Sequence, residues 1–384
     1  MFPQKRIMLI FGTRPEAIKM APLVSEIKKY KEILEPLVVV TAQHREMLDQ
    51  VLKVFNIAPD YDLDIMEPNQ SLTSIVVNAM ESLESVLVKE VPDMVLVQGD
   101  TSTTFVGALS SFYQRIPVGH IEAGLRTQEK FRPFPEEINR RLTTVITDLH
   151  FPPTPEAASN LLRENVAKSS VFISGNTVID AFLSIAKREF DLNKIGIDAK
   201  GRRIVLVTAH RRENFGAPMK NICEAVKALA KKYDDALFVI PMHKNPSVRS
   251  TISETLGNIK NIMLMDPLNY EPFVHLMKSS YIILSDSGGV QEEAPSLGKP
   301  VLVLREVTER PEAVTAGAVK LVGHNKEKII EEAEKLLCDP EEYEKMSRII
   351  NPYGDGKASE RIVKMLLHYF GFVDKKPDEF CVKM

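Results

Sequence analysis

Two carboxylates stand where a parallel sheet would present them to a ligand. Asp100 follows the apolar run 94–98, and Glu122 closes the next such run, 118–121. Ligands of parallel α/β sheets bind outside the carboxyl ends of the strands, so both side chains should face one cleft. Carboxylates that share a cleft raise each other's pKa, and one can then hold a proton near neutral pH. The pair predicts acid/base chemistry; the alternatives are a helix N-cap at Asp100 and an ion pair between Glu122 and Arg126.

A third carboxylate and two histidines extend this set. Glu136 opens an expected helix after a proline-rich turn, although an acidic residue there also suits the helix dipole without any further function. His210 follows the apolar run 204–207 and precedes two arginines. Nearby cations lower the pKa of an imidazole, so His210 should be neutral at pH 7. His243, a little further along the chain, is a second candidate for the same cleft.

Two glycine-containing turns are suited to phosphate groups. The stretch FGTRPEAIK (11–19) enters a helix with Arg14 and Lys19 near its start. It has neither the GxGxxG pattern nor a Walker lysine, and the alternative is a well-capped turn with surface cations. The stretch SDSGGVQEEAP (285–295) is more specific. Its glycine pair would let the backbone approach a diphosphate at the start of a helix.

Residues near the second turn would complete a nucleotide site. Glu293, about one helical turn after the glycines, fits the two hydroxyl donors of a ribose. Arg310 could add positive charge beside a diphosphate. Phe273 could stack on a base, but spacing alone favours core packing for this side chain.

Apolar runs alternate with helical patterns along the whole chain. The runs are rich in Val, Ile and Leu without polar alternation, as expected of strands buried on both faces of a parallel sheet. Alternation of strands and helices indicates an α/β, doubly wound fold. Strands are expected at 6–11, 37–41, 94–98, 118–121, 171–174, 204–207, 237–241, 262–265, 281–285 and 301–304.

The length of the chain indicates two Rossmann-like domains. It has 384 residues, and single cores usually stop growing at roughly 250–300 residues. The strand series runs through the chain twice, which places a boundary near residue 175. The N-terminal domain, 1–175, would carry the carboxylates, and the C-terminal domain, 176–384, would carry the nucleotide site. A last helix is expected at about 358–370, after a strong turn.

Composition narrows the classes of function. A net charge of −3 argues against an extended nucleic-acid footprint. The three cysteines, Cys223, Cys338 and Cys381, form no CxxC pair, so a disulfide scaffold or zinc site is not expected and a reducing compartment is the simple interpretation. No apolar run approaches the ~20 residues that span a bilayer. The N-terminal residues do not resemble a signal peptide.

Taken together, these stretches resemble the non-hydrolysing UDP-N-acetylglucosamine 2-epimerase family. The resemblance covers nearly the whole chain in order, and the joint match is far more specific than any single motif. It implies a glycosyltransferase-B-like fold with the active site in the cleft between two Rossmann-like domains. It also implies a last helix that crosses back to the first domain, a homodimer, and domain closure over the substrate. The matching segments are FGTRPE (11–16), QGDT (98–101), HIEAGLR (120–126), PEEINR (135–140), HRRE (210–213), SGGVQEEAP (287–295) and ERPE (309–312).

The resemblance also implies roles for individual residues, without a metal or a redox cofactor. Many bacterial members bind UDP-N-acetylglucosamine as an activator beside the active site. In this chain Asn69 stands where several members have an arginine, so the resemblance supports activation less strongly than catalysis. The catalytic positions match Asp100, Glu122, Glu136 and His210. The UDP-sugar contacts match Arg14, Lys19, Phe273, Ser287, Gly288, Gly289, Glu293 and Arg310. The activator region matches Gln43, His44, Arg211 and His243.

The reaction implied by the resemblance is the reversible epimerisation at C2 of UDP-N-acetylglucosamine to UDP-N-acetylmannosamine. The C2 proton is not acidic, so the family eliminates UDP in the anti sense to give 2-acetamidoglucal and re-adds it in the syn sense. A base and an acid on opposite faces of the sugar are required, and two or three carboxylates suit that demand. Which carboxylate serves which face stays open. The expected setting is the cytoplasm, in cell-surface polysaccharide biosynthesis.

Three other functions fit parts of the sequence. A hydrolysing epimerase would release free N-acetylmannosamine and UDP, and it shares fold and part of the motifs. A glycosyltransferase of the same fold would need an acceptor. A nucleotide-sugar sensor would bind without turnover, but the set of cleft carboxylates argues against it.

Overall fold

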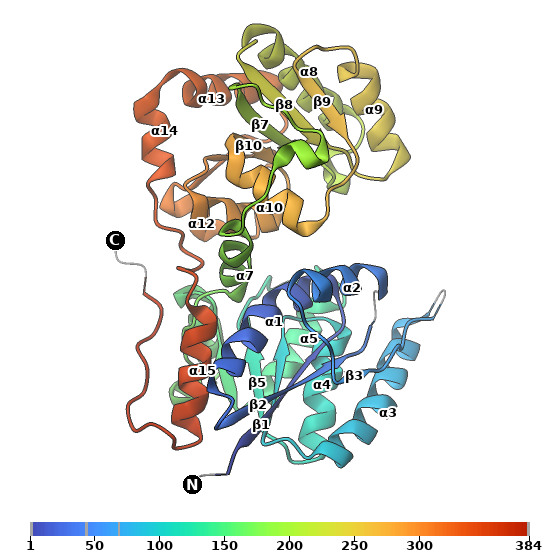
Figure 1. Cartoon of the computed structure of the whole chain (residues 1–384), viewed down its shortest axis with the longest axis vertical. Helices are drawn as coiled ribbons and strands as arrows, with labels where there is room; N and C mark the ends of the chain where they lie inside the picture. The colour runs from blue at the N-terminus through green and yellow to red at the C-terminus, as the bar shows by residue number, and fades with distance from the viewer. Residues whose placement is uncertain (1–2, 43–44, 68–69, 382–384) are drawn as a thin grey trace. The chain divides into compact units, whose positions relative to one another are not determined.

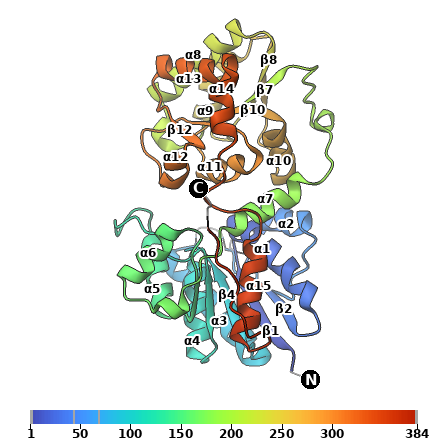
Figure 2. The ribbon, with the colours of Figure 1, turned by 90° about the vertical axis from the view of Figure 1, so that its left-hand side faces the viewer.

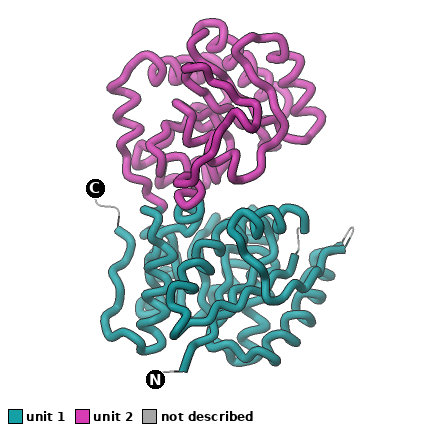
Figure 3. Tube along the Cα trace, viewed as in Figure 1, with its two compact units in different colours: residues 1–181, 354–383 teal, residues 182–353, 384 magenta. Residues whose placement is uncertain are grey.

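The computed structural model describes residues 3–42, 45–67 and 70–381. The chain forms two compact units, coloured separately in Figure 3. The first unit contains the described residues up to Ala181 together with those from Gly354 onward, and the second contains Phe182–Tyr353. The division falls inside helix α7 (Thr177–Ala186), a few residues after the boundary expected near residue 175.

The first unit is built on a six-stranded parallel sheet in the order β3-β2-β1-β4-β5-β6. Every residue from Ile7 to Phe11 in the central strand is fully buried, because helices cover both faces of the sheet (Figures 1 and 2). This burial explains the unbroken apolar run. The strands are β1 (Lys5–Phe11), β2 (Leu34–Val40), β3 (Tyr61–Asp62), β4 (Met94–Gln98), β5 (Val118–Ile121) and β6 (Leu149–Phe151). The other helices are α1 (Arg14–Ile27), α2 (Arg45–Val54), α3 (Leu72–Glu90), α4 (Ser102–Tyr113), α5 (Glu136–Val145), α6 (Pro155–Arg163) and α15 (Ala358–Tyr369).

The second unit repeats this topology with the strand order β12-β11-β10-β7-β8-β9. The prediction of two doubly wound, Rossmann-like folds is therefore confirmed. The strands are β7 (Arg203–Thr208), β8 (Ala236–Pro241), β9 (Ile262–Met265), β10 (Ser280–Ser285), β11 (Val301–Val303) and β12 (Val319–Leu321). The helices are α8 (Ala217–Lys232), α9 (Pro246–Leu256), α10 (Tyr270–Ser279), α11 (Gly288–Glu293), α12 (Pro311–Ala316), α13 (Lys326–Cys338) and α14 (Pro340–Ser347).

Both sheets have a point where the strand order reverses. It lies between β1 and β4 in the first unit and between β7 and β10 in the second. Loops that leave the carboxyl ends of these strands diverge there, and parallel α/β proteins bind their ligands in the resulting crevice.

The last helix belongs to the first unit. Helix α15 packs against α1, and the two elements lie side by side in Figures 1 and 2. Its first two backbone amides, of Ala358 and Ser359, donate to the carboxylate of Asp180 on α7 at 3.1 and 2.7 Å. A side chain distant in sequence therefore caps this helix.

One expected strand does not form. Residues 171–174 make only an isolated bridge, between Val171 and His150. Conversely, β3, β6 and β12 are real but were not expected. These strands have two or three residues each, too few for hydrophobic periodicity to reveal them.

Candidate active site

A pocket of about 480 Å³ opens at the reversal point of the first unit. It brings together five residues singled out in the sequence: Arg14, Lys19, Asp100, Glu122 and Glu136. Asp100 and Glu122 lie in loops that follow strands, Arg14 and Glu136 begin helices, and Lys19 lies in the second turn of α1. The pocket is lined by Thr13, Arg14, Pro15, Glu16, Lys19, Met47, Gln98, Gly99, Asp100, Thr101, Glu122 and Glu136.

Glu122 is held by three side chains of the first unit. The ammonium of Lys19 lies 2.6 Å from both of its carboxylate oxygens, Oε1 and Oε2. Gln98 Nε2 donates to Oε2, and Asn176 Nδ2 donates to Oε1 at 3.2 Å. The backbone of Glu122 has φ +62°, a left-handed conformation that is unusual for a side chain of this size and turns the residue out of the strand.

The ion pair proposed as an alternative for Glu122 does not form with Arg126. Arg126 instead binds Glu164 through Nε at 2.8 Å and Nη2 at 2.6 Å. Lys19, expected among the UDP-sugar contacts, is the cation that faces Glu122.

Asp100 is placed to exchange a proton near neutral pH. Its side chain is 29% exposed and lies 3.7 Å from Arg140 Nη1. Burial raises the pKa of Asp100 to about 6; the Arg140 guanidinium opposes this rise, and the Glu122 carboxylate adds to it. The mutual effect expected of two carboxylates is therefore present, but burial is the larger cause. Asn139 Nδ2 fixes the loop by donating to the Asp100 carbonyl at 3.0 Å.

Glu136 and Glu137 have different roles although they are adjacent. Glu137 is fully buried and pairs with Arg140 at 3.2 Å and Arg141 at 3.0 Å. Glu136, the first residue of α5, lines the pocket, and its buried Oε2 has no hydrogen-bond partner among the described residues. Glu136 therefore keeps an unused acceptor, while Glu137 holds the helix in place.

Glu16 has a role that the sequence reasoning missed. Its Oε2 accepts from the amides of Gly12 and Thr13 at 3.1 and 2.7 Å. Its Oε1 accepts from the hydroxyls of Thr101 and Thr104 at 2.6 and 3.0 Å. The carboxylate thus ties the Arg14 loop to the Asp100 loop. The capping-box spacing TRPE at 13–16 was the available signal, although it reveals only the Oε2 half of these contacts.

The second unit places His210 over a buried carboxylate. Its Nδ1 lies 3.4 Å from Asp286 Oδ1, and its ring stacks on His243 with the ring centroids 5.7 Å apart. Burial lowers the pKa of His210; Asp286 opposes this shift, and His243 and Arg211 add to it. The expected direction is found, but burial rather than the neighbouring arginines is the largest cause.

The glycine turn of the second unit leaves room that the protein itself does not use. A Cβ at Gly288 would lie 3.6 Å from Arg211 Nη2, and one at Gly289 would lie 3.9 Å from Ser287 Oγ. Both distances are ordinary contacts, so packing within the chain does not require glycine here. Close approach of another molecule to the backbone would explain the pair.

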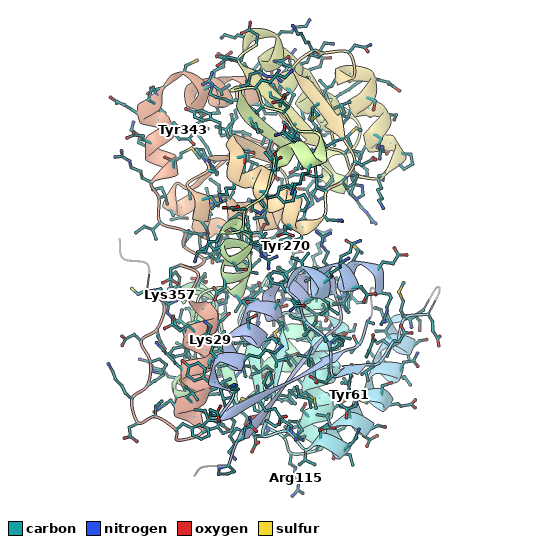
Figure 4. The ribbon with its side chains drawn as sticks, viewed as in Figure 1. Lys29, Tyr61, Arg115, Tyr270, Tyr343 and Lys357 are labelled. Carbon is teal, nitrogen blue, oxygen red and sulfur yellow. The ribbon has the colours of Figure 1, made fainter. Side chains whose placement is uncertain are left out.

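The remaining predicted contacts have mixed surroundings. Glu293 is buried, and Arg310 pairs through Nε with the buried carboxylate Glu292. Phe273 is half-buried on α10, the helix that begins at Tyr270, labelled in Figure 4. Of the expected activator residues, Gln43 and His44 lie outside the described residues, as does Asn69.

Known proteins are similar to this chain over most of its length. The family model of UDP-N-acetylglucosamine 2-epimerase matches residues 26–367. The UDP-N-acetylglucosamine 2-epimerase of Escherichia coli K12 is 53% identical over 369 residues, which cover 94% of this chain and 98% of that protein. The Bacillus subtilis protein of the same name is 51% identical and covers 98% of this chain and 99% of its own length.

This chain belongs to the UDP-N-acetylglucosamine 2-epimerase family.

Solved structures agree with this assignment. The crystal structure of the UDP-GlcNAc 2-epimerase from Neisseria meningitidis bound to UDP-GlcNAc is 53% identical, covers 94% of this chain and 99% of that chain, and has a TM-score of 0.82. The glycosyltransferase of kitacinnamycin is 12% identical over 94% of this chain and 99% of its own, with a TM-score of 0.62, and shows the fold alone. The predictions of a glycosyltransferase-B-like fold and of an isomerase of this family are confirmed.

Across residues 3–42, 45–67 and 70–381, no three His, Cys, Asp or Glu side chains are grouped so that they could hold a metal ion. Within the same ranges, none of the helices combines the length and hydropathy that crossing a bilayer requires.

Proposed function

We propose that this epimerase interconverts UDP-N-acetylglucosamine and UDP-N-acetylmannosamine without releasing free sugar. The Neisseria meningitidis relative was crystallised with UDP-GlcNAc, which supports this nucleotide sugar as the substrate. The observation that carries the mechanism is the pocket that joins Asp100, Glu122 and Glu136.

The chemistry needs proton exchange on both faces of the sugar ring. In the forward direction a carboxylate takes the C2 proton, the C1–O bond breaks, UDP leaves with the electron pair, and a C1=C2 double bond forms. In the return, a UDP oxygen bonds to C1 while an acid delivers a proton to the other face of C2. Asp100 can serve either step near neutral pH, because its pKa of about 6 keeps both protonation states populated.

The nucleotide would be held by residues of the second unit. We assign the diphosphate to the Ser287–Gly289 turn with Arg310, the ribose to Glu293 and the base to Phe273. Arg14 and Lys19, which line the pocket of the first unit, we keep as contacts of the UDP-sugar. His210 would face the departing diphosphate. The glycine pair supports this assignment, because an added Cβ would make only ordinary contacts within the chain, at 3.6 and 3.9 Å, and packing therefore does not explain the glycines.

Assembly and regulation belong to the same proposal. We expect a homodimer. The neighbouring helices α3 and α4 expose Val77 (45%), Val88 (58%), Phe112 (54%) and Tyr113 (63%), and exposed apolar surface favours a protein partner. Arg211 and His243 would take part in binding UDP-N-acetylglucosamine as an activator. A cytoplasmic location and a role in cell-surface polysaccharide biosynthesis complete the proposal.

Proton NMR of UDP-N-acetylglucosamine with the enzyme in D2O tests the reaction directly. We expect UDP-N-acetylmannosamine with deuterium at C2 and no accumulation of free UDP. Accumulating UDP and free N-acetylmannosamine would instead identify a hydrolysing epimerase. Absence of both turnover and C2 exchange, with binding intact, would identify a sensor, and turnover only after an acceptor is added would identify a glycosyltransferase.

A further inference from the structure

Asp286 in the second unit has one carboxylate oxygen that accepts hydrogen bonds and one that accepts none from the described residues. The residue follows β10 and is completely buried. Its Oδ2 accepts from the backbone N–H groups of His210 and Arg211, each at 2.8 Å, and from Asn214 Nδ2 at 2.9 Å. Its Oδ1 is also buried and makes no hydrogen bond to any described residue.

The atom that faces Oδ1 is Nδ1 of His210. The two atoms are 3.4 Å apart, slightly beyond the roughly 2.7–3.2 Å of a standard N–H···O bond. A buried carboxylate oxygen without a donor is costly, so a small rotation of the ring that brings an Nδ1–H into range is favoured. The imidazole has freedom for this motion, since its side chain is 40% exposed.

We infer that Asp286 is a positioning residue, which keeps the proton of neutral His210 on Nδ1 and thereby presents Nε2 as the nitrogen that meets the ligand. The tautomer of a histidine is set by the hydrogen bond that its other nitrogen makes. Arg211 and Asn214 bind Oδ2 of the same carboxylate, so the loop that carries His210 and the acceptor that orients its ring are fixed by one side chain.

This tautomer has a consequence for nucleotide binding, which rests on the proposed function. Neutral His210 would present a lone pair at Nε2 to the diphosphate, which repels it. Binding should therefore be coupled to protonation: His210 takes up a proton from solvent, Nε2–H donates to a phosphate oxygen, and Asp286 neutralises the imidazolium. Three groups face the ring and set this equilibrium, namely Asp286, His243 and Arg211.

The tautomer is measured first, by ¹⁵N NMR of histidine-labelled enzyme, with the His210 signals assigned from their loss in His210→Asn. The wild type should show Nδ1–H. In Asp286→Asn the amide oxygen can keep the backbone donors while its NH2 faces the ring, so His210 should switch to Nε2–H. An Nε2–H tautomer in the wild type, or no switch in a folded Asp286→Asn, would overturn the inference; the wild-type spectrum decides even if the variant does not fold.

Nucleotide binding is measured second, by calorimetry with UDP-N-acetylglucosamine in an Asp100→Asn background that suppresses turnover. Affinity should fall by up to about tenfold per pH unit between the pKa of His210 in the free enzyme and its higher pKa in the complex. It should vary less than about twofold over the same range when Asp286→Asn is added, because neutral Nε2–H can then donate. His243→Phe should keep the pH dependence, which excludes His243 as its source.

Asn214→Ala serves as the control for loss of stability. Asn214→Ala removes a donor to Oδ2 without touching the face toward His210, so it should lower the melting temperature and leave tautomer and pH dependence unchanged. The same pH dependence in Asp286→Asn as in the wild type would overturn the coupling. Failure of the wild type to bind any UDP-sugar would refute the proposed function, while the NMR result would still decide the role of Asp286.

Discussion

Asp100 and Asp286 follow corresponding strands, β4 and β10, each the fourth strand of its unit in chain order. Their surroundings nevertheless differ. Asp100 opens onto a pocket and faces Arg140 at 3.7 Å, outside hydrogen-bond range. Asp286 is completely buried, and one of its oxygens accepts three N–H donors. The same residue type at the same point of the same fold is a candidate reagent in one unit and part of the framework in the other.

The difference lies in what the loops supply. In the first unit, the loop amides after β1 are satisfied by Glu16, so Asp100 does not have to cap them. In the second unit, the amides after β7 are satisfied by Asp286 itself. A carboxylate can act on a ligand only where another group has already satisfied the backbone.

The largest effect that we expect from this difference follows neutralisation of the pocket carboxylates. Asp100→Asn or Glu122→Gln should reduce turnover by about 10³-fold or more, because proton transfer to carbon loses its partner. UDP affinity, measured by calorimetry, should stay within a few fold. Glu156→Gln, on an exposed ion pair of α6, is the matched control. Loss of UDP binding in both pocket variants would mean that these carboxylates are structural.

The next effect is on stability and should appear in the second unit. Asp286→Ala removes the acceptor of three N–H groups, so we expect the free energy of unfolding to fall by about 2–4 kcal/mol. Asp100→Ala should cost less than about 1 kcal/mol. Urea denaturation of both variants tests the contrast, and equal losses would erase it.

A smaller effect concerns the pH dependence of stability. The pKa of Asp100 is raised from 3.8 to about 6 in the folded chain. Between these values the folded protein binds a proton that the unfolded protein has lost, so stability contributed by this group falls as pH rises. Asp100→Asn should therefore be more stable than the wild type by about 1–2 kcal/mol at pH 7.5. The gain should disappear at pH 4, as followed by thermal melts; a constant difference would contradict the shift.

The smallest effect expected is at the glycine turn. Gly289→Ala should leave the melting temperature within about 2 °C, because the added Cβ meets nothing closer than 3.9 Å. It should weaken UDP binding by about tenfold if a diphosphate approaches this backbone. Gly257→Ala, where a Cβ would lie 2.6 Å from the Ser253 carbonyl oxygen, should show the reverse pattern of lost stability with unchanged affinity.

The sequence was sufficient for the fold because strand after strand carries an unbroken apolar run, as in 6–11 and 204–207. It was also sufficient to name Asp100 and Glu122 as pocket residues, since both follow such runs. It was insufficient for contacts between residues that are distant in the sequence. The contact of Lys19 with Glu122 joins residues 103 positions apart. The pKa of His210 is lowered mainly by burial, and burial cannot be inferred from the two arginines that follow His210 in the sequence.

The return of α15 to the first unit has a consequence for biosynthesis. The second unit is one continuous stretch, so it can fold once residue 353 has left the ribosome. The first unit, although most of it is translated earlier, lacks the helix that packs on α1 until residues 358–369 emerge. Until then the face of α1 that α15 covers stays exposed, and a stop codon before Ala358 would leave that face uncovered.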